Sequence, residues 1–292
     1  MLHSVKTNSM RKVLSVSVFF VAFSLLLSCK SDDPSPKTTF DISVDAPVTV
    51  AAGAESYVYV YKESGVPETR YASKISFTVP DNIYEVKVNR FTRSSSPTLN
   101  EPRKVDEDFS NHTTIAMARK SHTFSFPSGV GLKINANEKF DIGMKVINPT
   151  ATDIKSLKSS VTFEAPTTTI THEALPFAFY NLNVSMPPAS AGTITTNFTA
   201  PEKWTLVMMT SFAGKYITNV KVSTIKNGIA AEVYNSNDWE DPLVKTLDAL
   251  VLNPGDKLKL EADYNNTSNH TVTFGNGSDD DFTGVFLYYY KD

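Results

Sequence analysis

The sequence predicts an all-β protein made of two tandem antiparallel β-sandwiches of the jelly-roll type. Eight segments alternate apolar and polar residues and are rich in β-branched or aromatic side chains, which is typical of half-buried strands. These segments are residues 56–63, 84–91, 139–148, 159–164, 180–186, 193–200, 204–212 and 218–224. Turn-forming residues separate them at 64–67, 79–82, 127–129, 187–192, 226–228 and 253–256. No segment sustains a helical period with caps, although 104–113 suits a short helical turn, and many short strands with regular turns favour sandwiches or jelly rolls.

A boundary between two domains is expected near the middle of the chain. Residues 164–176 are rich in Thr and Pro and carry no strong core pattern. We therefore predict one sandwich over 39–165 and a second over 174–292, each of roughly 120 residues, which is an ordinary domain size. Residues 29–38 are mostly Ser, Asp and Pro and read as a flexible tether.

The first 28 residues have the features of a secretory signal peptide. Lys6, Arg11 and Lys12 precede an apolar stretch over 13–28 that is short and interrupted by Ser, as in the hydrophobic region of such signals. The stretch ends in Leu-Leu-Ser-Cys at 26–29, which resembles the lipobox of bacterial lipoproteins. This resemblance implies that the thiol of Cys29 carries a diacylglycerol anchor. The alternative is a cleaved signal followed by a chance Cys.

The residues after Cys29 indicate where the anchored protein would lie. Lys-Ser-Asp-Asp-Pro at 30–34 resembles the surface-export signal of Bacteroidota lipoproteins. The resemblance implies an outer-membrane lipoprotein exposed on the cell surface, with the membrane as a partner through its lipid.

Removal of the signal and lipidation would leave a weakly acidic chain without a thiol. Cys29 is the only Cys, so the mature chain would have no disulfide, no Cys metal ligand and no Cys nucleophile. The signal takes three of the 28 basic residues, so 25 stand against 31 acidic residues, a formal charge of −6. No basic stripe is present, which argues against nucleic acid as a partner.

The second half contains four elements in a fixed order. They are a strand before Pro187–Pro188, the strand 204–212 followed by Gly214, the Pro-Gly-Asp turn at 254–256, and a Gly-rich acidic turn before Tyr288. Their order and spacing resemble the C-terminal domain of the copper type II, ascorbate-dependent monooxygenases, the peptidylglycine α-hydroxylating and dopamine β-monooxygenase family. The first half matches more loosely, through 126–134, 144–149 and 84–91. The resemblance covers nearly the whole mature chain and implies the same double jelly roll.

The copper ligands of that family are absent from the matching positions. Where the family has five His and one Met, this chain has Val86, Lys87, Lys145, Met209, Ser211 and Phe282. Copper at such sites needs imidazole, and a Lys ammonium repels a cation. We therefore expect the scaffold without its chemistry, and no cofactor. The soft Met208 and Met209 pair is a weak alternative as a Cu(I) site, but neighbours on a strand point to opposite faces.

Two other places were considered for an ion. The mature His residues form no pair at metal-ligand spacing, although His112 and His122 flank one stretch and would meet across a hairpin; His172 lies in the expected linker and His270 in an expected loop. The Ser-Asp-Asp-Asp turn at 278–281 offers oxygens for Ca²⁺, but consecutive residues diverge in a strand. The favoured interpretation is a solvated turn that keeps a sheet edge wet, with Phe282 in core packing.

Aromatic side chains are the candidate ligand contacts. Trp239 lies in a polar loop that suits stacking on a sugar, and Tyr234 and Trp204 are further candidates; packing is the alternative for each. Tyr288 and Tyr290 share one face of the last strand and Tyr289 takes the other, either as packing or as a ligand platform.

Three functions remain open from the sequence. The preferred one is a non-catalytic surface lipoprotein that binds a glycan or a protein at loops or in the cleft between the sandwiches. The second is a hydrolase, because the bacterial peptide N-glycosidase family uses a similar double jelly roll with an acidic site near the domain interface. Its candidate carboxylates are Asp81, Glu85, Glu164 and Glu173. The third is a metal-dependent monooxygenase with unconventional ligands.

The lipid anchor gives a direct test. Replacing Cys29 with Ala removes the thiol that would be lipidated, so we expect the variant to leave the membrane fraction. Fractionation and immunoblotting of wild type and variant measure this, with Ser31→Ala, which keeps the thiol of Cys29, as the matched control. Retention of the variant in the membrane would refute the anchor.

Overall fold

The computed structural model describes residues 39–91, 98–104, 112–275 and 280–291, and within them every regular element is a β-strand. None of these residues forms a helix with the length and hydropathy needed to cross a membrane. The signal peptide, the tether, Cys29 and most of the turn expected at 104–113 lie outside the described residues.

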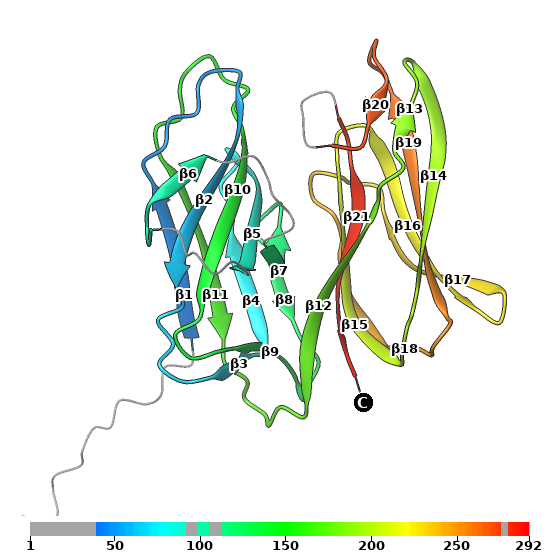
Figure 1. The fold of residues 1–292 in the computed structure, drawn as a ribbon, viewed down its shortest axis with the longest axis horizontal. Coiled ribbons are helices and arrows are strands. Elements are labelled where there is room, and N and C mark those ends of the chain that lie inside the picture. Colours follow the sequence, from blue (N-terminus) through cyan, green and yellow to red (C-terminus); the bar gives the residue numbers. More distant parts are fainter. Residues whose placement is uncertain (1–38, 92–97, 105–111, 276–279, 292) are drawn as a thin grey trace, which may run out of the picture. The chain divides into compact units, whose positions relative to one another are not determined.

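The first sandwich consists of two sheets formed by residues 39–164 (Figure 1, blue to green). One sheet has the order β1 (Thr39–Ala46), β11 (Leu157–Glu164), β4 (Lys74–Thr78) and β8 (Thr123–Ser125). The other has the order β6 (Pro102–Lys104), β2 (Glu55–Glu63), β10 (Lys139–Ile147), β5 (Ile83–Phe91) and β7 (His112–Ala118).

The second sandwich is formed by strands from residues 172–290, with two strands of the first half added to one sheet. That sheet has the order β18 (Val244–Leu252), β15 (Trp204–Ala213), β21 (Thr283–Tyr290), β12 (His172–Asn181), β9 (Val130–Ile134) and β3 (Arg70–Ala72). The facing sheet has the order β14 (Ser190–Thr199), β19 (Lys257–Asn266), β16 (Ile217–Lys226) and β17 (Ile229–Ser236), and β13 (Ser185–Met186) pairs with β20 (Val272–Thr273).

The strand order makes both sandwiches jelly rolls. When the eight main strands of each half are ranked along the chain, one sheet contains the first, eighth, third and sixth, and the other the second, seventh, fourth and fifth. The same order occurs twice, and the pairs within each four-stranded sheet are antiparallel. This is the double Greek-key arrangement of a jelly roll. The predicted fold class is therefore confirmed.

Burial explains why the strands read differently in the sequence. β19 alternates buried and more exposed residues because one of its faces meets solvent. β15 is buried at all ten positions. Its Met209 lies in the core of the second sandwich, whereas Met208 packs in the cluster that contains the core of the first. A sheet that is covered on both faces requires such a continuous apolar strand.

Strand pairing and packing join the two sandwiches. The start of β12 pairs in parallel with β9, from His172 opposite Val130. Tyr288 of β21 is fully buried, and its hydroxyl donates a hydrogen bond to the carbonyl of Ile115 in β7 at 2.7 Å. Residues 38–292 form one compact unit. The division into two independent domains at 165 and 174 therefore stays a prediction.

Two predicted boundaries are wrong. The segment 180–186 is not one strand: β12 ends at Asn181, whose side chain accepts a hydrogen bond from the backbone N–H of Asn183 and so turns the chain. The expected linker over 172–176 is the first half of β12, which also pairs with β21 through Leu175 and Tyr289. Its partners are remote in sequence, so no local pattern reveals it.

The buried hydroxyl of Tyr288 gives a stability prediction. Tyr288→Phe leaves the carbonyl of Ile115 without this partner, and an unpaired buried polar group costs about 1–3 kcal/mol. Chemical denaturation should show a loss of that size. Tyr289→Phe is the matched control on the other face of β21 and should change stability by less than ~0.5 kcal/mol. Equal effects of the two substitutions would contradict the assigned role.

Candidate functional site

One face of the first sandwich carries charged residues that are buried. Ile142 and Met144 of β10 and Val86 of β5 point into the core. The alternate residues point to the opposite face, where the strand register sets Lys145 opposite Glu85 and Gly143 opposite Lys87. A face away from the core is normally solvated, yet Glu85 is only 2% exposed. Buried charges of this kind concentrate at functional sites.

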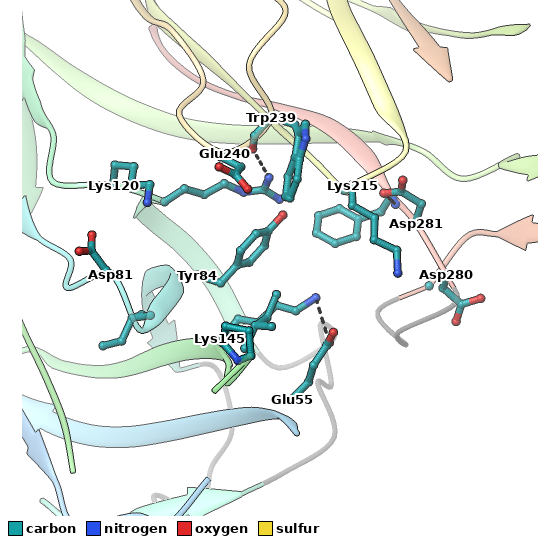
Figure 2. A pocket seen from close by; sticks show the side chains of 17 residues that line it. Glu55, Asp81, Tyr84, Lys120, Lys145, Lys215, Trp239, Glu240, Asp280 and Asp281 are labelled. Atoms are coloured by element: carbon teal, nitrogen blue, oxygen red, sulfur yellow. Dashed lines mark hydrogen bonds and ion pairs between the residues drawn. The ribbon is translucent and has the colours of Figure 1, made fainter. Parts of the chain in front are cut away.

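A cleft of about 450 Å³ opens at the end of this face. Its walls come from the β5 region with Tyr84, from the end of β7 with Arg119, from β10 with Lys145, and from second-sandwich loops that contribute Trp239 and Phe282. Figure 2 shows Tyr84, Lys145 and Trp239 around the hollow. The volume is in the range of small-molecule sites, so the cleft is the leading candidate site of the described chain.

Arg119 links the walls of the cleft. Its guanidinium carbon lies 4.5 Å from the centroid of the Tyr84 ring and 6.0 Å from that of Phe282. Its Nη1 donates a hydrogen bond to the backbone carbonyl of Trp239. Its Nε lies 3.9 Å from Oε2 of Glu85, which is an ion pair rather than a hydrogen bond. Nε and Nη2 have no hydrogen-bond partner among the described residues. A buried guanidinium with unmet donors is costly and sits more often at functional sites than in plain scaffolds.

Glu85 stays ionised beneath Arg119. Burial pushes the pKa of Glu85 upward, but the positive charges of Lys87 and then Arg119 outweigh burial and hold the pKa below its ordinary value. The Lys87 ammonium lies 3.0 Å from Oε1 of Glu85. Glu85 therefore neutralises the cations behind the cleft rather than serving as an acid.

Lys145 brings an ammonium group to the floor of the cleft among aromatic rings. Nζ lies 5.3 Å from the ring centroids of both Tyr57 and Tyr84 and 5.9 Å from that of Phe282. Its ion-pair partner is Oε2 of Glu55 at 3.9 Å (Figure 2, dashed line). Burial lowers the pKa of Lys145, against the opposing charges of Glu55 and Glu85.

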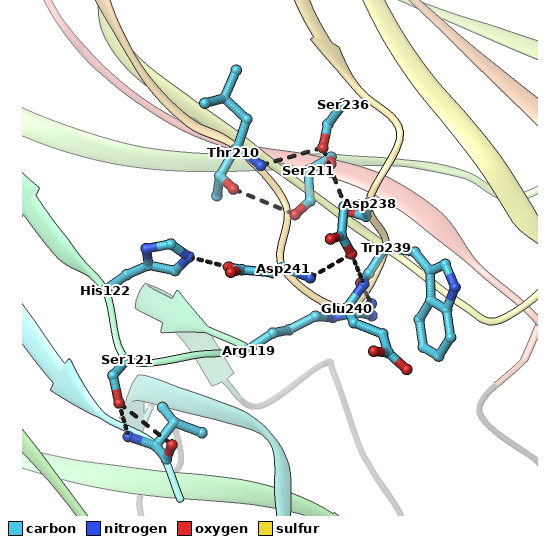
Figure 3. A network of polar contacts seen from close by, with 12 residues as sticks. Arg119, Ser121, His122, Thr210, Ser211, Ser236, Asp238, Trp239, Glu240 and Asp241 are labelled. Carbon is cyan, nitrogen blue, oxygen red and sulfur yellow. Dashed lines mark hydrogen bonds and ion pairs between the residues drawn. The ribbon is translucent and has the colours of Figure 1, made fainter. Parts of the chain in front are cut away.

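The loop that carries Trp239 is fixed locally and by the first sandwich (Figure 3). The Asp238 carboxylate accepts the backbone N–H groups of Glu240 and Asp241, each at 2.9 Å, which closes a tight turn. Across the joint, Nε2 of His122 lies 2.6 Å from Oδ1 of Asp241. The indole of Trp239 packs at 5.9 Å from the Tyr84 ring. Trp239 is therefore half-buried and held as a wall of the cleft.

The acidic turn before the last strand contributes structure rather than a wet edge. Asp281 is 1% exposed, so the expectation of a solvated turn is wrong for this residue. Its two carboxylate oxygens accept the backbone N–H groups of Tyr216 at 3.0 Å and Phe282 at 2.7 Å. A Cβ on Gly214 would lie 1.6 Å from Oδ1 of Asp281, which explains the glycine there. Asp280 diverges and accepts from Thr273, and residues 278 and 279 lie outside the described residues.

Two of the three aromatic candidates are core residues. Tyr234 is 0% exposed, and its hydroxyl donates to the carbonyl of Leu243 and accepts from the backbone N–H of Ser211. Trp204 is 4% exposed and stacks on Tyr289 at 3.9 Å. Their assignment as ligand contacts is wrong because strand registers turn both side chains inward. Trp239 alone lines the cleft, as its polar loop suggested.

The last strand follows its predicted alternation. Tyr288 and Tyr290 pack on the cluster of the first sandwich, and Tyr289 packs on the core of the second. Phe282 packs in the first of these clusters and also borders the cleft.

The six positions that match the family's copper ligands do not surround one point. Val86 and Met209 lie in two different cores, and Ser211 bonds to the Tyr234 hydroxyl. Lys87, Lys145 and Phe282 lie near the cleft. Among the described residues, no three His, Cys, Asp or Glu side chains gather in a way that suits a metal ion. Absence of a cofactor stays a prediction.

The four His residues are separate. His122 bonds to Asp241, whereas Nε2 of His112 lies 2.9 Å from the buried Asp141 carboxylate, so the expected meeting of His112 and His122 is wrong. They flank the two ends of the extended strand β7 instead of a hairpin. His172 packs on the Tyr290 ring, and His270 lies 6.5 Å from that of Tyr216.

The four candidate carboxylates of the hydrolase alternative do not converge. Asp81 is an exposed residue that borders the cleft, and Glu85 lies buried next to its floor. Glu164 pairs with Lys74 at 2.9 Å, and Glu173 is an exposed residue of β12.

Sequence reasoning missed Arg119 and Tyr84, and it singled out the turn that contains Asp281 without predicting the burial of this residue. Arg119 follows the short apolar run at the end of β7, and no motif marks it. Tyr84 carries no signal beyond its place in the expected strand 84–91. The sole available signal was the charge spacing of Glu85, Lys87 and Lys145 within apolar strands, since alternate charges on buried strands indicate a polar face with partners.

Asp281 gives a pH prediction. Burial raises its pKa from 3.8 to about 6, although backbone hydrogen bonds and Arg119 oppose the shift. Because the folded protein holds the proton more tightly, the carboxyl favours folding below pH ~4, and this contribution is lost as pH rises through about 6. A ¹³C NMR titration of the carboxyl carbon should give a midpoint near 6. Asp45 is the control, because its hydrogen bond with Lys158 lowers its pKa. A midpoint for Asp281 below that of Asp45 would refute the prediction.

Comparison with known proteins yields only distant structural likeness. No family model and no curated protein matches the sequence. The major capsid protein P2 from Bacteriophage PM2 is similar over 86% of this chain and 98% of its own, at 9% identity and TM-score 0.31. The STIV MCP is similar over 85% of this chain and 96% of its own, at 9% identity and TM-score 0.36. A β-porphyranase of glycoside hydrolase family 86 from Bacteroides plebeius is similar over 81% of this chain and 35% of its own, at 9% identity and TM-score 0.19. Such low scores carry no functional inference, and the strand order is the ground for assigning a double jelly roll.

Proposed function

We propose that this protein is a non-catalytic cell-surface lipoprotein that binds a glycan in the cleft walled by Trp239. The observation that carries the proposal is that the one exposed-loop tryptophan expected to stack on a sugar borders a cleft of ligand size. The lipobox-like sequence at Cys29 supports the surface location.

The chemistry of the cleft suits a carbohydrate. A sugar ring has apolar C–H faces that pack on aromatic rings, and hydroxyls that both donate and accept hydrogen bonds. Trp239 and Phe282 offer the rings. Around them, Lys145 donates and Glu55 and Glu240 accept. The mixture of donors and acceptors at short range matches the alternation of hydroxyls on a sugar.

The contacts also argue for binding without catalysis. The carboxylate oxygens of Asp281 are both engaged by backbone N–H groups, and Glu85 is held ionised by Lys87 and Arg119. Glu85 is therefore not a proton donor near neutral pH, and the Asp281 carboxyl is engaged with the backbone of Tyr216 and Phe282. Arg119 and the turn at Asp238 hold the Trp239 wall in place, and a preformed wall reduces the entropy cost of binding.

A binding experiment tests the proposal. The protein is screened on a glycan array that includes neutral and uronate-containing oligosaccharides, and the hits are measured by calorimetry. We expect Trp239→Ala to weaken binding by about tenfold to thirtyfold, because truncating a central aromatic contact costs about 2 kcal/mol.

The matched control is Ile229→Ala. Ile229 is 74% exposed at the hairpin between β16 and β17 and does not border the cleft, so its truncation should leave affinity unchanged. Absence of any array hit, or equal binding by wild type and Trp239→Ala, would refute glycan binding in this cleft.

A further inference from the structure

We propose that the glycan carries a carboxylate, as in a uronic acid, and that Lys145 binds this carboxylate at the floor of the cleft. The inference rests on the proposed function and names its ligand class. It is carried by an ammonium group whose hydrogen-bonding capacity is unused.

The donors of Lys145 are unmet in the described part of the chain. An ammonium has three N–H donors. The partner of Nζ is Glu55 Oε2 at 3.9 Å, which is beyond hydrogen-bonding distance, and its other neighbours are the rings of Tyr57, Tyr84 and Phe282. The side chain is only 9% exposed, and it borders the cleft. A ligand that enters the cleft therefore meets an ammonium without an acceptor.

The carboxylates near Lys145 are mostly committed to other cations. The cluster contains the cations Lys87, Arg119 and Lys145 and the carboxylates Glu55 and Glu85, and the charge of Arg119 also acts on the Asp281 carboxyl. Glu85 is committed to Lys87, its partner at 3.0 Å. Only Glu55 forms an ion pair with Lys145, and its side chain is 34% exposed and at long range. One carboxylate from a ligand would supply Lys145 with a charge-assisted hydrogen bond.

Neighbouring acids do not take this place. Asp281 also borders the cleft, but both of its oxygens accept backbone N–H groups. Asp280 accepts the hydroxyl of Thr273. Asp81 and Glu240 are exposed at the rim, where water screens them. The low-dielectric floor, where a charge pair is strongest, is left to Lys145.

The rings make the site selective for a sugar acid rather than for a free anion. Phe282 contacts the Lys145 ammonium at 5.9 Å, and Trp239 lies 5.9 Å from Tyr84, whose ring also faces this ammonium. A ring-borne carboxylate reaches the ammonium while its sugar ring packs on the aromatic wall. An inorganic anion gains only the first contact. Figure 2 shows Trp239, Tyr84 and Lys145 around the same hollow.

The test compares trigalacturonate with its methyl ester on the whole protein by calorimetry at pH 7. The ester keeps the sugar rings and removes the charge. We expect the acid to bind at least ~10-fold more tightly than the ester, because only the acid places a carboxylate against the Lys145 ammonium. Lys145→Met should abolish this difference, whereas the matched control Lys158→Met, at a 71% exposed side chain far from the cleft lining, should keep it.

A second variant covers the case in which Lys145→Met does not fold. Glu55→Gln removes the competing charge and leaves the ammonium, so the ratio of acid affinity to ester affinity should be larger in this variant than in wild type. Equal binding of acid and ester, with loss in Trp239→Ala, would overturn the carboxylate and leave glycan binding standing. Binding of a neutral glycan from the array, without binding of trigalacturonate or its ester, would also overturn the carboxylate and leave glycan binding standing. No binding of any glycan would overturn both.

Discussion

The guanidinium of Arg119 is the contact on which the cleft wall at the joint between the two sandwiches depends. It neutralises Glu85 of the first sandwich, covers the Tyr84 ring and bonds to the Trp239 carbonyl of the second. Each of these contacts is made in a buried setting, where a missing partner leaves a charge uncompensated and costs several kcal/mol. The order of the two jelly rolls places the end of β7 and the loop 236–243 together, and the contacts of Arg119 fix this loop as a wall of the cleft.

A buried layer of charge is a poor source of stability. The attraction within a buried ion pair offsets little more than the free energy of its desolvation. An apolar layer of equal volume would make the folded state as stable or more stable. The cluster of Glu85, Lys87, Arg119 and Lys145 nevertheless occupies one face of the β10–β5 pair, while the opposite face packs Val86, Ile142 and Met144 into the core. Unmet donors on Arg119 and Lys145 add to the cost. We infer that the layer is maintained for binding. Contacts with a ligand in the cleft above it would offset the free energy spent on burying these charges.

The sequence predicted the architecture well and the site in part. Period-two segments located most of the strands, because one-sided burial leaves a local trace. The sequence did not predict the first half of β12 or the burial of Tyr234 and Trp204. Strand partners and register decide both, and these are set by residues far away in the chain. The polar loop pointed to Trp239, which borders the cleft, and its role as a ligand contact stays a prediction; Lys145 was named only as a lost ligand position. Arg119 carries no local signature, since its burial arises from the meeting of two sandwiches, whereas the acidic turn marked Asp281 but predicted it to be solvated.

The central claim is that the cleft between Trp239 and Lys145 is the binding site, and hydrogen exchange measured by mass spectrometry tests it most directly. The protein is compared with and without a saturating amount of the tightest-binding oligosaccharide from the array. The account predicts slower exchange in peptides that cover the end of β7 and the loop 236–243, with little change in the β16–β17 hairpin. Protection confined to other regions, with these two segments unchanged, would contradict it.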